Sequence, residues 1–308
     1  MKQDVWLRMT DGHEVFVNHW YDEKNQPKAV LQIAHGMAEH SQRYEGFAEF
    51  LVNKGVYVVA NDHRGHGRTG ENSGALGFFA EEYGFEKVVD DLKEVNLFIH
   101  EVYPGVPVFM MGHSMGSFLV RRFIQCYHGD ISGVVISGTG GSLGLLGKVG
   151  KLIAKTQIWT RGKRTESPLM NKLSFGNYNQ AIPDVQTDFD WLTKDQDEVK
   201  KYMEDPYCGF ISTSGFFYDL LSGIEALHQA DAMQRIEKDL PFLFISGDRD
   251  PVGNHTKGVL KVIKQYKKIG IRHITSIFYK DGRHEMLHEW NREEVMADIE
   301  NWLDKLLN

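Results

Sequence analysis

Short apolar runs with the composition of β-strands alternate with amphipathic helical segments along most of this chain. Three such runs are AVLQIAHG at 29–36, VYVVAND at 56–62 and PVFMMGH at 107–113. Segments with helical spacing follow them at about 42–54, 84–103 and 117–127. Because parallel strands need long crossover connections, which are usually helices, this order predicts a mostly parallel sheet with helices on both faces. The predicted fold class is therefore α/β.

The alternation of predicted strands and helices stops between residues 142 and 210 and then resumes. Further strands are expected at 4–9, 14–20, 131–138, 241–247 and 272–280, and further helices at 215–229, 255–268 and 291–307. By contrast, residues 142–210 are polar and rich in turns, with helical pieces but no alternating strand. An inserted subdomain explains such a stretch better than a long structureless loop does. We expect a core formed by 1–141 and 211–308, with 142–210 inserted over the sheet.

Composition excludes several classes of function. The 308 residues carry a formal net charge of -7, and no basic stripe suited to phosphate contacts stands out, which argues against nucleic-acid binding. Two cysteines are too few for a disulfide framework, and no CxxC pattern predicts a metal site. Lys2 and Asp4 leave no room for the apolar region of a signal peptide, and the apolar runs are shorter than a membrane span. The expectation is a soluble, cytoplasmic, globular protein.

The segment GHSMGS at 112–117 joins a predicted strand to a predicted helix. It fits the pattern GxSxG, with Gly112, Ser114 and Gly116, in the context where such a serine acts as a nucleophile. The glycines let strand and helix approach while the hydroxyl projects from the sheet edge, and the helix points its positive end at an oxyanion formed there. The alternative is a chance match in which Ser114 only caps the helix.

A serine nucleophile needs a histidine base that is oriented by an acid. His284 follows the last predicted strand, so a parallel sheet would place it at the same carboxyl edge as Ser114. His288 is its rival if the segment is already helical. Packing or loop hydrogen bonds would account for the histidines near strand ends and glycine-rich turns, which are His35, His63, His66 and His113.

The segment SGDRDPVG at 246–253 follows another predicted strand and offers two candidate acids. Asp250 precedes Pro251, which restrains it to an extended conformation further out on the loop. Asp248 could instead hydrogen-bond its own turn. Local chemistry leans towards Asp250 and leaves both aspartates open, while the chain order Ser, Asp, His is that of α/β-hydrolases.

Five sequence blocks occur together in one order. They are HGMAEHSQRY at 35–44, NDHRGHGRTG at 61–70, GHSMGS at 112–117, GDRDPV at 247–252 and GRHEML at 282–287. With these blocks the chain resembles the α/β-hydrolase superfamily, and within it the lid-bearing monoacylglycerol lipase and lysophospholipase group of the serine aminopeptidase S33 type. The resemblance extends from about residue 29 to the end. It implies the α/β-hydrolase fold and makes 142–210 the variable lid.

The resemblance also implies roles for individual residues. In that family the acid is the third residue after the strand-ending glycine, which here is Asp250, and the base corresponds to His284. The backbone N–H groups of Met37 and Met115 correspond to the oxyanion donors, although HGMAE could also be a simple strand-to-helix turn. The sequence departs from the commoner HGxGE form by having Ala38 where glycine is frequent.

Three further residues are predicted to contact substrate. Glu39 and Arg43 match family positions at the polar end of the site, near the glycerol moiety of the substrate. A salt bridge that braces the loop is an equal alternative for this pair. His113, beside the serine, completes the predicted substrate contacts.

The function implied by the resemblance is that of a serine esterase cleaving a single-chain acyl ester, such as a monoacylglycerol or a lysophospholipid. No metal or organic cofactor is expected. One rival is a short-chain carboxylesterase, thioesterase or proline-type aminopeptidase on the same scaffold, because fold and triad do not set the leaving group. Another is a ligand-binding α/β-hydrolase without chemistry, which would be expected to lack a triad residue, whereas none is missing here. The oligomeric state is not predicted.

The start of the predicted lid has an apolar stripe and a basic cluster. The stripe consists of Leu143, Leu145, Leu146, Val149, Leu152, Ile153, Ile158 and Trp159. Packing of a lid helix onto the core is the favoured explanation, and covering a lipid tunnel or transiently touching a membrane or micelle is the alternative. The basic cluster is Lys148, Lys151, Lys155, Arg161, Lys163 and Arg164. A solvated face is favoured for it over a contact with anionic lipid or a partner.

Overall fold

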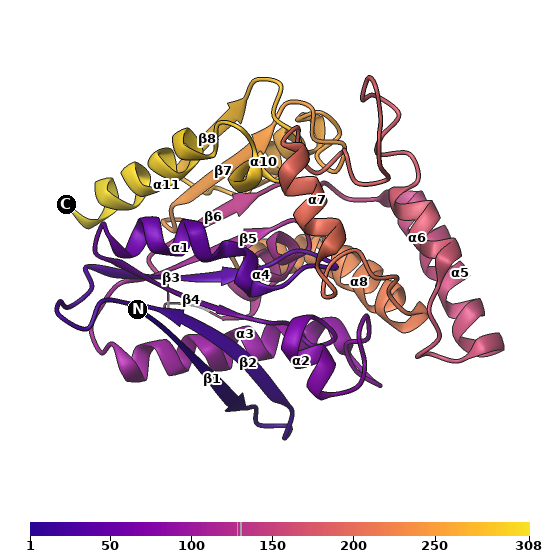
Figure 1. The fold of residues 1–308 in the computed structure, drawn as a ribbon, viewed down its shortest axis with the longest axis horizontal. Helices are drawn as coiled ribbons and strands as arrows, with labels where there is room; N and C mark the ends of the chain where they lie inside the picture. Colours follow the sequence, from indigo (N-terminus) through magenta and orange to yellow (C-terminus); the bar gives the residue numbers. More distant parts are fainter. Residues whose placement is uncertain (128, 130) are drawn as a thin grey trace.

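Eight strands form one sheet in the order β1-β2-β4-β3-β5-β6-β7-β8 (Figure 1). The computed structural model that shows this sheet describes residues 1–127, 129 and 131–308. The strands are β1 (Lys2–Arg8), β2 (Glu14–Trp20), β3 (Ala29–Ala34), β4 (Val56–Asn61), β5 (Val108–His113), β6 (Gly133–Ser137), β7 (Phe242–Gly247) and β8 (Ile274–Tyr279). β1 pairs with β2 and β2 with β4 in antiparallel fashion, and the other neighbours are parallel. The prediction of a mostly parallel sheet is confirmed.

Helices connect the parallel strands. Those of the core are α1 (Glu45–Val52) after the short 3-10 helix η1 (Ser41–Tyr44), α2 (Gly67–Asn72), α3 (Gly84–Val102), α4 (Met115–Cys126), α8 (Ser214–Leu227), α9 (Ala230–Gln234), α10 (Lys257–Lys268), the 3-10 helix η2 (Met286–His288) and α11 (Arg292–Leu307). The predicted helices all form, with boundaries shifted by a few residues. The short helices α2 and α9 were missed, because five or six residues are too few to show a helical period.

The two faces of the sheet build two apolar layers. Phe109 and Met111 of β5 pack with α1 and α11 on one face, while Met110 packs with α3, α4 and α8 on the other. This follows from the two-residue period of a strand. Since both faces are covered, the central strands are mostly apolar on both faces, which is how their sequences identified them. Each large apolar side chain buried in this way contributes about 1.5–3 kcal/mol.

Residues 142–210 supply three helices and none of the eight strands. These helices are α5 (Gly144–Arg161), α6 (Pro168–Phe175) and α7 (Gln196–Glu204). They lie beyond the carboxyl ends of the strands, on the right in Figure 1. α5 packs against α8 and α6. The position suits the predicted lid, and that role is taken up below as a proposal.

The apolar stripe of α5 faces solvent instead of the core. The exposed fractions are 75% for Leu145, 81% for Leu146, 65% for Leu152 and 87% for Trp159. The favoured prediction that the stripe packs onto the core is therefore wrong for these four side chains, because α5 is held by other contacts, in which Ala154 is fully buried. In the described part of the chain, no helix has both the length and the apolar composition needed to cross a membrane.

Candidate active site

The predicted site residues gather at the carboxyl edge of the sheet. Met37 follows β3, Ser114 follows β5, Asp250 follows β7 and His284 follows β8. These strands are parallel and lie within one continuous run of the sheet order, so their carboxyl ends share an edge. A cavity of about 420 Å³ opens at this edge, and both Ser114 and His284 line it.

Ser114 occupies a strained turn between β5 and α4. Its φ and ψ are 51° and -116°, a conformation that costs a non-glycine residue free energy. The Ser114 N–H donates to the Ser137 carbonyl at 3.0 Å, which anchors the turn to the next strand. A Cβ at Gly112 would lie 2.4 Å from the Gly116 carbonyl oxygen, and one at Gly116 would lie 2.0 Å from the Ala34 carbonyl oxygen. Both positions therefore require glycine, as the motif predicts.

His284 and Asp250 form a buried pair. His284 Nδ1 lies 3.0 Å from Asp250 Oδ1, and both side chains are almost fully buried. A proton on Nδ1 donates to the carboxylate and leaves Nε2 as an acceptor. Nε2 has no hydrogen-bond partner among the described residues. Burial lowers the pKa of His284, but the charge and hydrogen bond of Asp250 outweigh it, so the pKa is raised above its ordinary value.

A close approach of two loops brings this pair together. A Cβ at Gly247 would lie 2.1 Å from the carbonyl oxygen of Gly282. Only glycine at this position lets the loop after β7 meet the loop after β8. The glycines in GDRDPV and GRHEML are therefore structural conditions for the contact between His284 and Asp250.

The neighbouring Asp248 has a different environment. It is partly exposed, and its Oδ1 accepts a hydrogen bond from the N–H of Asp281 at 2.8 Å. The expectation that Asp248 bonds its own turn is wrong, since it ties together the loops after β7 and β8. The local turn is made by Asp250, whose Oδ1 accepts from the Val252 N–H at 2.9 Å.

His288 turns away from the cavity. Its Nε2 lies 3.2 Å from the Arg43 carbonyl oxygen, and its Nδ1 lies 3.5 Å from Glu285 Oε2. It does not line the cavity that contains Ser114. The geometry therefore favours His284 over this rival as the base.

The loop after β3 carries the predicted oxyanion donor Met37. Next to it, Ala38 has a φ of 52°, in the left-handed region. This conformation favours glycine, which explains why the commoner form of the motif has glycine there. The Ala38 carbonyl accepts from the Tyr202 hydroxyl at 2.8 Å and from the Gly209 N–H at 3.0 Å. Residues of 142–210 thus hold the loop in shape.

Two backbone donors are left free at the cavity. Among the described residues, the N–H groups of Met37 and Met115 donate no hydrogen bond. Met115 is the first residue of α4, where helical N–H groups have no partner within the helix. Of the two, Met37 lines the cavity, and the role of both N–H groups as oxyanion donors stays a prediction.

Glu39 and Arg43 form an ion pair with a third residue, Glu285. Arg43 Nη1 donates to Glu39 Oε2 at 2.8 Å, and its two terminal nitrogens donate to Glu285 at 2.6 and 2.7 Å. Burial raises the pKa of Glu285, but Arg43 outweighs it and holds that pKa well below its usual range. Glu39 also accepts from the Gly36 N–H at 2.5 Å. These contacts match the bracing alternative, and the predicted substrate contact of Glu39 and Arg43 stays a prediction.

The remaining histidines near the site are neutral and packed. The His113 ring lies 4.7 Å from the His284 ring, and its Nδ1 lies 3.2 Å from the Ser137 hydroxyl. Burial, followed by the charge of His284, lowers the pKa of His113 to about 4. His113 lines the cavity, so a contact with substrate remains a prediction. The ring centroids of His35 and His63 lie 4.0 Å apart with the planes tilted by 36°, which agrees with the packing role expected for them.

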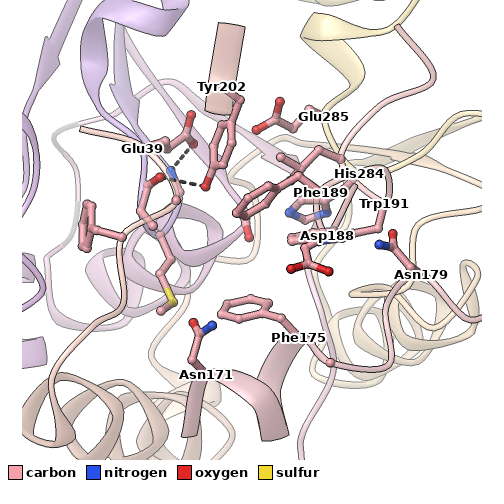
Figure 2. Close-up of a pocket in the computed structure, with 18 of the residues that line it drawn as sticks. Glu39, Asn171, Phe175, Asn179, Asp188, Phe189, Trp191, Tyr202, His284 and Glu285 are labelled. Atoms are coloured by element: carbon pink, nitrogen blue, oxygen red, sulfur yellow. Dashed lines mark hydrogen bonds between the residues drawn. The ribbon is translucent and has the colours of Figure 1, made fainter. Parts of the chain in front are cut away.

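Sequence analysis missed most of the cavity wall. The side chains from residues 142–210 that line it are Asn171, Lys172, Phe175, Asn179, Asp188, Phe189, Trp191, Leu192, Tyr202 and Phe210. Figure 2 shows Phe189 and Trp191 beside His284, with Asn171 and Phe175 at the end of the pocket away from Glu39. None of the eight residues of the apolar stripe lines the cavity. Asn171, Lys172 and Phe175 lie in the short helix α6 and Tyr202 lies in α7, while the other missed residues lie in irregular segments. The only available signal was the density of aromatic residues between 175 and 191.

Comparison with known proteins agrees with this geometry. The profile of the family described as "Serine aminopeptidase, S33" matches residues 25–291. The chain belongs to this family. It is 27% identical over 307 residues to the monoglyceride lipase of Homo sapiens, covering 96% of this chain and 88% of that protein. It is 26% identical over 305 residues to the monoacylglycerol lipase of Mycolicibacterium smegmatis, covering 97% of this chain and 91% of that protein.

A solved structure supports the fold of this S33 family member. The crystal structure of a highly thermostable carboxyl esterase from Bacillus coagulans in complex with glycerol matches it with a TM-score of 0.92. The two chains are 26% identical, and the match covers 100% of this chain and 99% of the esterase. The α/β-hydrolase fold predicted from the sequence is confirmed.

Proposed function

We propose that this chain is a serine carboxylic ester hydrolase that cleaves single-chain acyl esters, such as monoacylglycerols or lysophospholipids. The observation that carries the proposal is the buried pair of His284 and Asp250 at a cavity that Ser114 also lines. The S33 family and its lipase and esterase relatives support the class of reaction. The residue roles and the substrate are our own inference.

In the first half of the reaction, the Ser114 hydroxyl attacks the ester carbonyl while His284 Nε2 takes its proton. Asp250 keeps Nδ1 protonated and stabilises the imidazolium that forms. The Met37 and Met115 N–H groups donate to the oxyanion of the tetrahedral intermediate, and each such donor typically contributes about 3 kcal/mol to transition-state stabilisation. The imidazolium then protonates the leaving alcohol, and an acyl-enzyme remains.

In the second half, His284 activates a water molecule that attacks the acyl-enzyme. The same two N–H groups stabilise the second oxyanion, and the fatty acid leaves as Ser114 regains its proton. Every proton in this scheme moves through His284, so the scheme needs no metal or organic cofactor.

The cavity wall supports a substrate with one apolar and one polar part. Phe175, Phe189 and Trp191 offer apolar surface to an acyl chain, and Phe175 stacks on Trp191 at 5.8 Å. Asn171 and Asp188 offer polar groups that suit the hydroxyls of an alcohol such as glycerol. This mixture of groups is the reason for preferring a single-chain lipid ester over a fully apolar one.

We also propose that 142–210 acts as a lid and touches a membrane or micelle transiently. The strongly exposed apolar side chains of α5 support this proposal, because a monomeric protein rarely exposes such a patch without a use. Lysines alternate with them on the same helix, which suits an interface with lipid head groups.

Substrate chain length tests the proposal most directly. Rates of hydrolysis would be measured on monoacylglycerols and lysophospholipids of increasing acyl length, on nitrophenyl esters and on amino-acid amides. We expect kcat/KM to rise with chain length into the long-chain range, because each buried methylene adds about 0.8 kcal/mol. A preference for acetyl esters would favour a short-chain carboxylesterase, and a preference for prolyl amides an aminopeptidase.

A further inference from the structure

Three side chains with metal-ligating atoms meet beside the oxyanion loop. They are His40, which ends the loop after β3, and Asp205 and Cys208 from the turn after α7. One ligand atom of each lies within 4.8 Å of the other two. In the sequence His40 is far from Asp205 and Cys208, and the three residues form no familiar metal-binding pattern, which is why motifs predicted no metal site.

The local backbone fixes two of the three ligands on the same side of one turn. The Cys208 N–H donates to the Asp205 carbonyl at 3.0 Å, and Asp205 Oδ1 accepts from the Tyr207 N–H at 2.8 Å. This leaves Asp205 Oδ2 free to face His40, whose Nε2 lies 2.8 Å away. The site therefore presents one nitrogen, one oxygen and one sulfur.

The spacing is close to that of a tetrahedral zinc site. Zinc bonds of about 2.0 Å to nitrogen and oxygen and about 2.3 Å to sulfur place tetrahedral ligand atoms roughly 3.3–3.5 Å apart. The contact of 2.8 Å between His40 and Asp205 must open slightly, and the Cys208 sulfur, at most 4.8 Å from either partner atom, must move by about 1 Å. Rotations of side chains are sufficient for both changes.

The charges around the site permit a cation. Lys2, Arg68 and Lys201 line a hollow beside His40 and Asp205, but Arg43 is the cation that acts most strongly on Cys208. The carboxylates of Glu39 and Glu285 neutralise the charge of Arg43, and both lie within hydrogen-bond distance of its guanidinium. Asp205 then contributes a further negative charge directly to the site. The summed charge of Arg43, Glu39, Glu285 and Asp205 is negative, which favours binding of a divalent cation.

Solvent reaches the site from two sides. Surface hollows of about 700 and 550 Å³ are both lined by His40 and Asp205. A metal ion therefore has an entry path, and a water molecule could complete the tetrahedron from either hollow.

We propose that His40, Asp205 and Cys208 bind a zinc-type divalent ion that joins the oxyanion loop to the turn after α7. The same two segments already share the hydrogen bond from the Gly209 N–H to the Ala38 carbonyl. A metal at this position would lock the loop that carries Met37. The ion is a stabilising clamp at a distance from Ser114 and takes no part in the ester chemistry.

Cobalt provides a test that does not depend on activity. Titration of the full chain with Co²⁺ should produce the near-ultraviolet charge-transfer band of a cobalt thiolate and the visible bands of a tetrahedral site. The C126S variant removes the other cysteine and should keep these bands, whereas C208S should lose the thiolate band. D205N keeps a side chain of the same shape and should weaken Co²⁺ binding by about tenfold or more.

Zn²⁺ should also raise the unfolding temperature of the wild-type chain and of C126S, and raise it less or not at all in C208S and H40Q. Absence of the thiolate band in the wild type would overturn the proposal. So would a band that survives in C208S, or Co²⁺ affinity and zinc stabilisation that are unchanged in both D205N and H40Q. Because the bands are measured without substrate, their outcome is independent of the proposed hydrolase function.

Discussion

Asp248 and Asp250 are one residue apart but contact different parts of the molecule. Asp250 is buried against His284, while Asp248 holds the backbone of the loop after β8. The side chain of Asp250 can therefore act on the imidazole, whereas Asp248 acts on loop geometry. Substitution by asparagine separates these roles because it removes the charge and keeps the size.

The first prediction is that Asp250→Asn lowers kcat by roughly a thousandfold or more, because the imidazole loses the partner that sets its tautomer. Asp248→Asn should lower kcat only a few-fold, since its amide oxygen can still accept from the Asp281 N–H. Steady-state kinetics on one long-chain ester, with both variants shown to be folded, measure the difference. The reverse order would assign the acid to Asp248.

The second prediction concerns the pH dependence of kcat/KM. Asp250 outweighs burial and raises the pKa of His284 above 6.5. A base must be unprotonated, so activity should be lost as the pH falls through that raised pKa, with the acid limb centred above 6.5. In Asp250→Asn the residual activity should have its acid limb at lower pH, because burial is then opposed only by the weaker effects of Glu285 and Glu39. An acid limb that stays in place in this variant would contradict the coupling.

At the scale of the element, the parallel strands and the connecting helices of the core could be predicted because their signals are local. The buried strands β3, β5 and β7 are mostly apolar runs, and the motifs that follow β5 and β8 place Ser114 and His284 at one edge. The assignment of Asp250 needed the spacing of a family, because the contact with His284 spans 34 residues of sequence. A local sequence pattern does not extend over 34 residues, so it could not show that Asp250 contacts His284.

The cavity wall could not be predicted for a related reason. Trp191 lies beside His284 because the Glu285 N–H donates to the Leu192 carbonyl at 2.7 Å, which joins two segments far apart in the sequence. The apolar stripe of α5 was noticed but placed wrongly, since periodicity shows that a helix has an apolar face and does not show what covers it. Among the proposed metal ligands, His40 is likewise far in the sequence from Asp205 and Cys208.

The third prediction concerns the binding of α5 to lipid vesicles. A variant with Leu146→Gln and Trp159→Gln should sediment with phosphatidylcholine vesicles containing an anionic lipid roughly tenfold less well than the wild type, because it loses exposed apolar area that lipid would bury. The matched control is Leu97→Gln with Leu260→Gln, which removes exposed side chains from α3 and α10. Equal binding of all three proteins would rule out membrane contact through α5.

For the whole molecule, buried histidines link stability to pH. Burial lowers the pKa to about 4 for His19, His66, His113 and His228. The unfolded chain regains a pKa near 6.5 at these positions, so it binds more protons than the folded chain as the pH falls from 6.5 towards 4. Their contribution to stability is present above 6.5 and is lost over that range.

Other groups act in the opposite direction. Burial raises the pKa of Asp91 and Asp219 to about 6, so the folded chain binds a proton at each site while the unfolded chain does not. Stability from these two groups increases as the pH falls through 6. His284 and Asp62, whose pKa values are also raised, act in the same direction as these two groups. The four histidines outnumber them once the other histidines with lowered pKa values are added, which are His13, His35, His63 and His288.

The fourth prediction follows from this balance. The melting temperature should fall by about 5 °C or more between pH 7.5 and pH 5.0, because the net proton uptake belongs to the unfolded chain. Thermal unfolding followed by circular dichroism in buffers of equal ionic strength measures it. A melting temperature that is unchanged or higher at pH 5.0 would mean that these histidines are not held neutral in the folded protein.

If Ser114 is the nucleophile, a fluorophosphonate probe should bind covalently to its side chain. The wild-type chain should be labelled with one probe per molecule, Ser114→Ala should fold and stay unlabelled, and Ser117→Ala, at a neighbouring serine of the same motif, should still react. Mass spectrometry of the labelled peptide should place the adduct on Ser114. Labelling that persists in Ser114→Ala, or an adduct on another residue, would contradict the account.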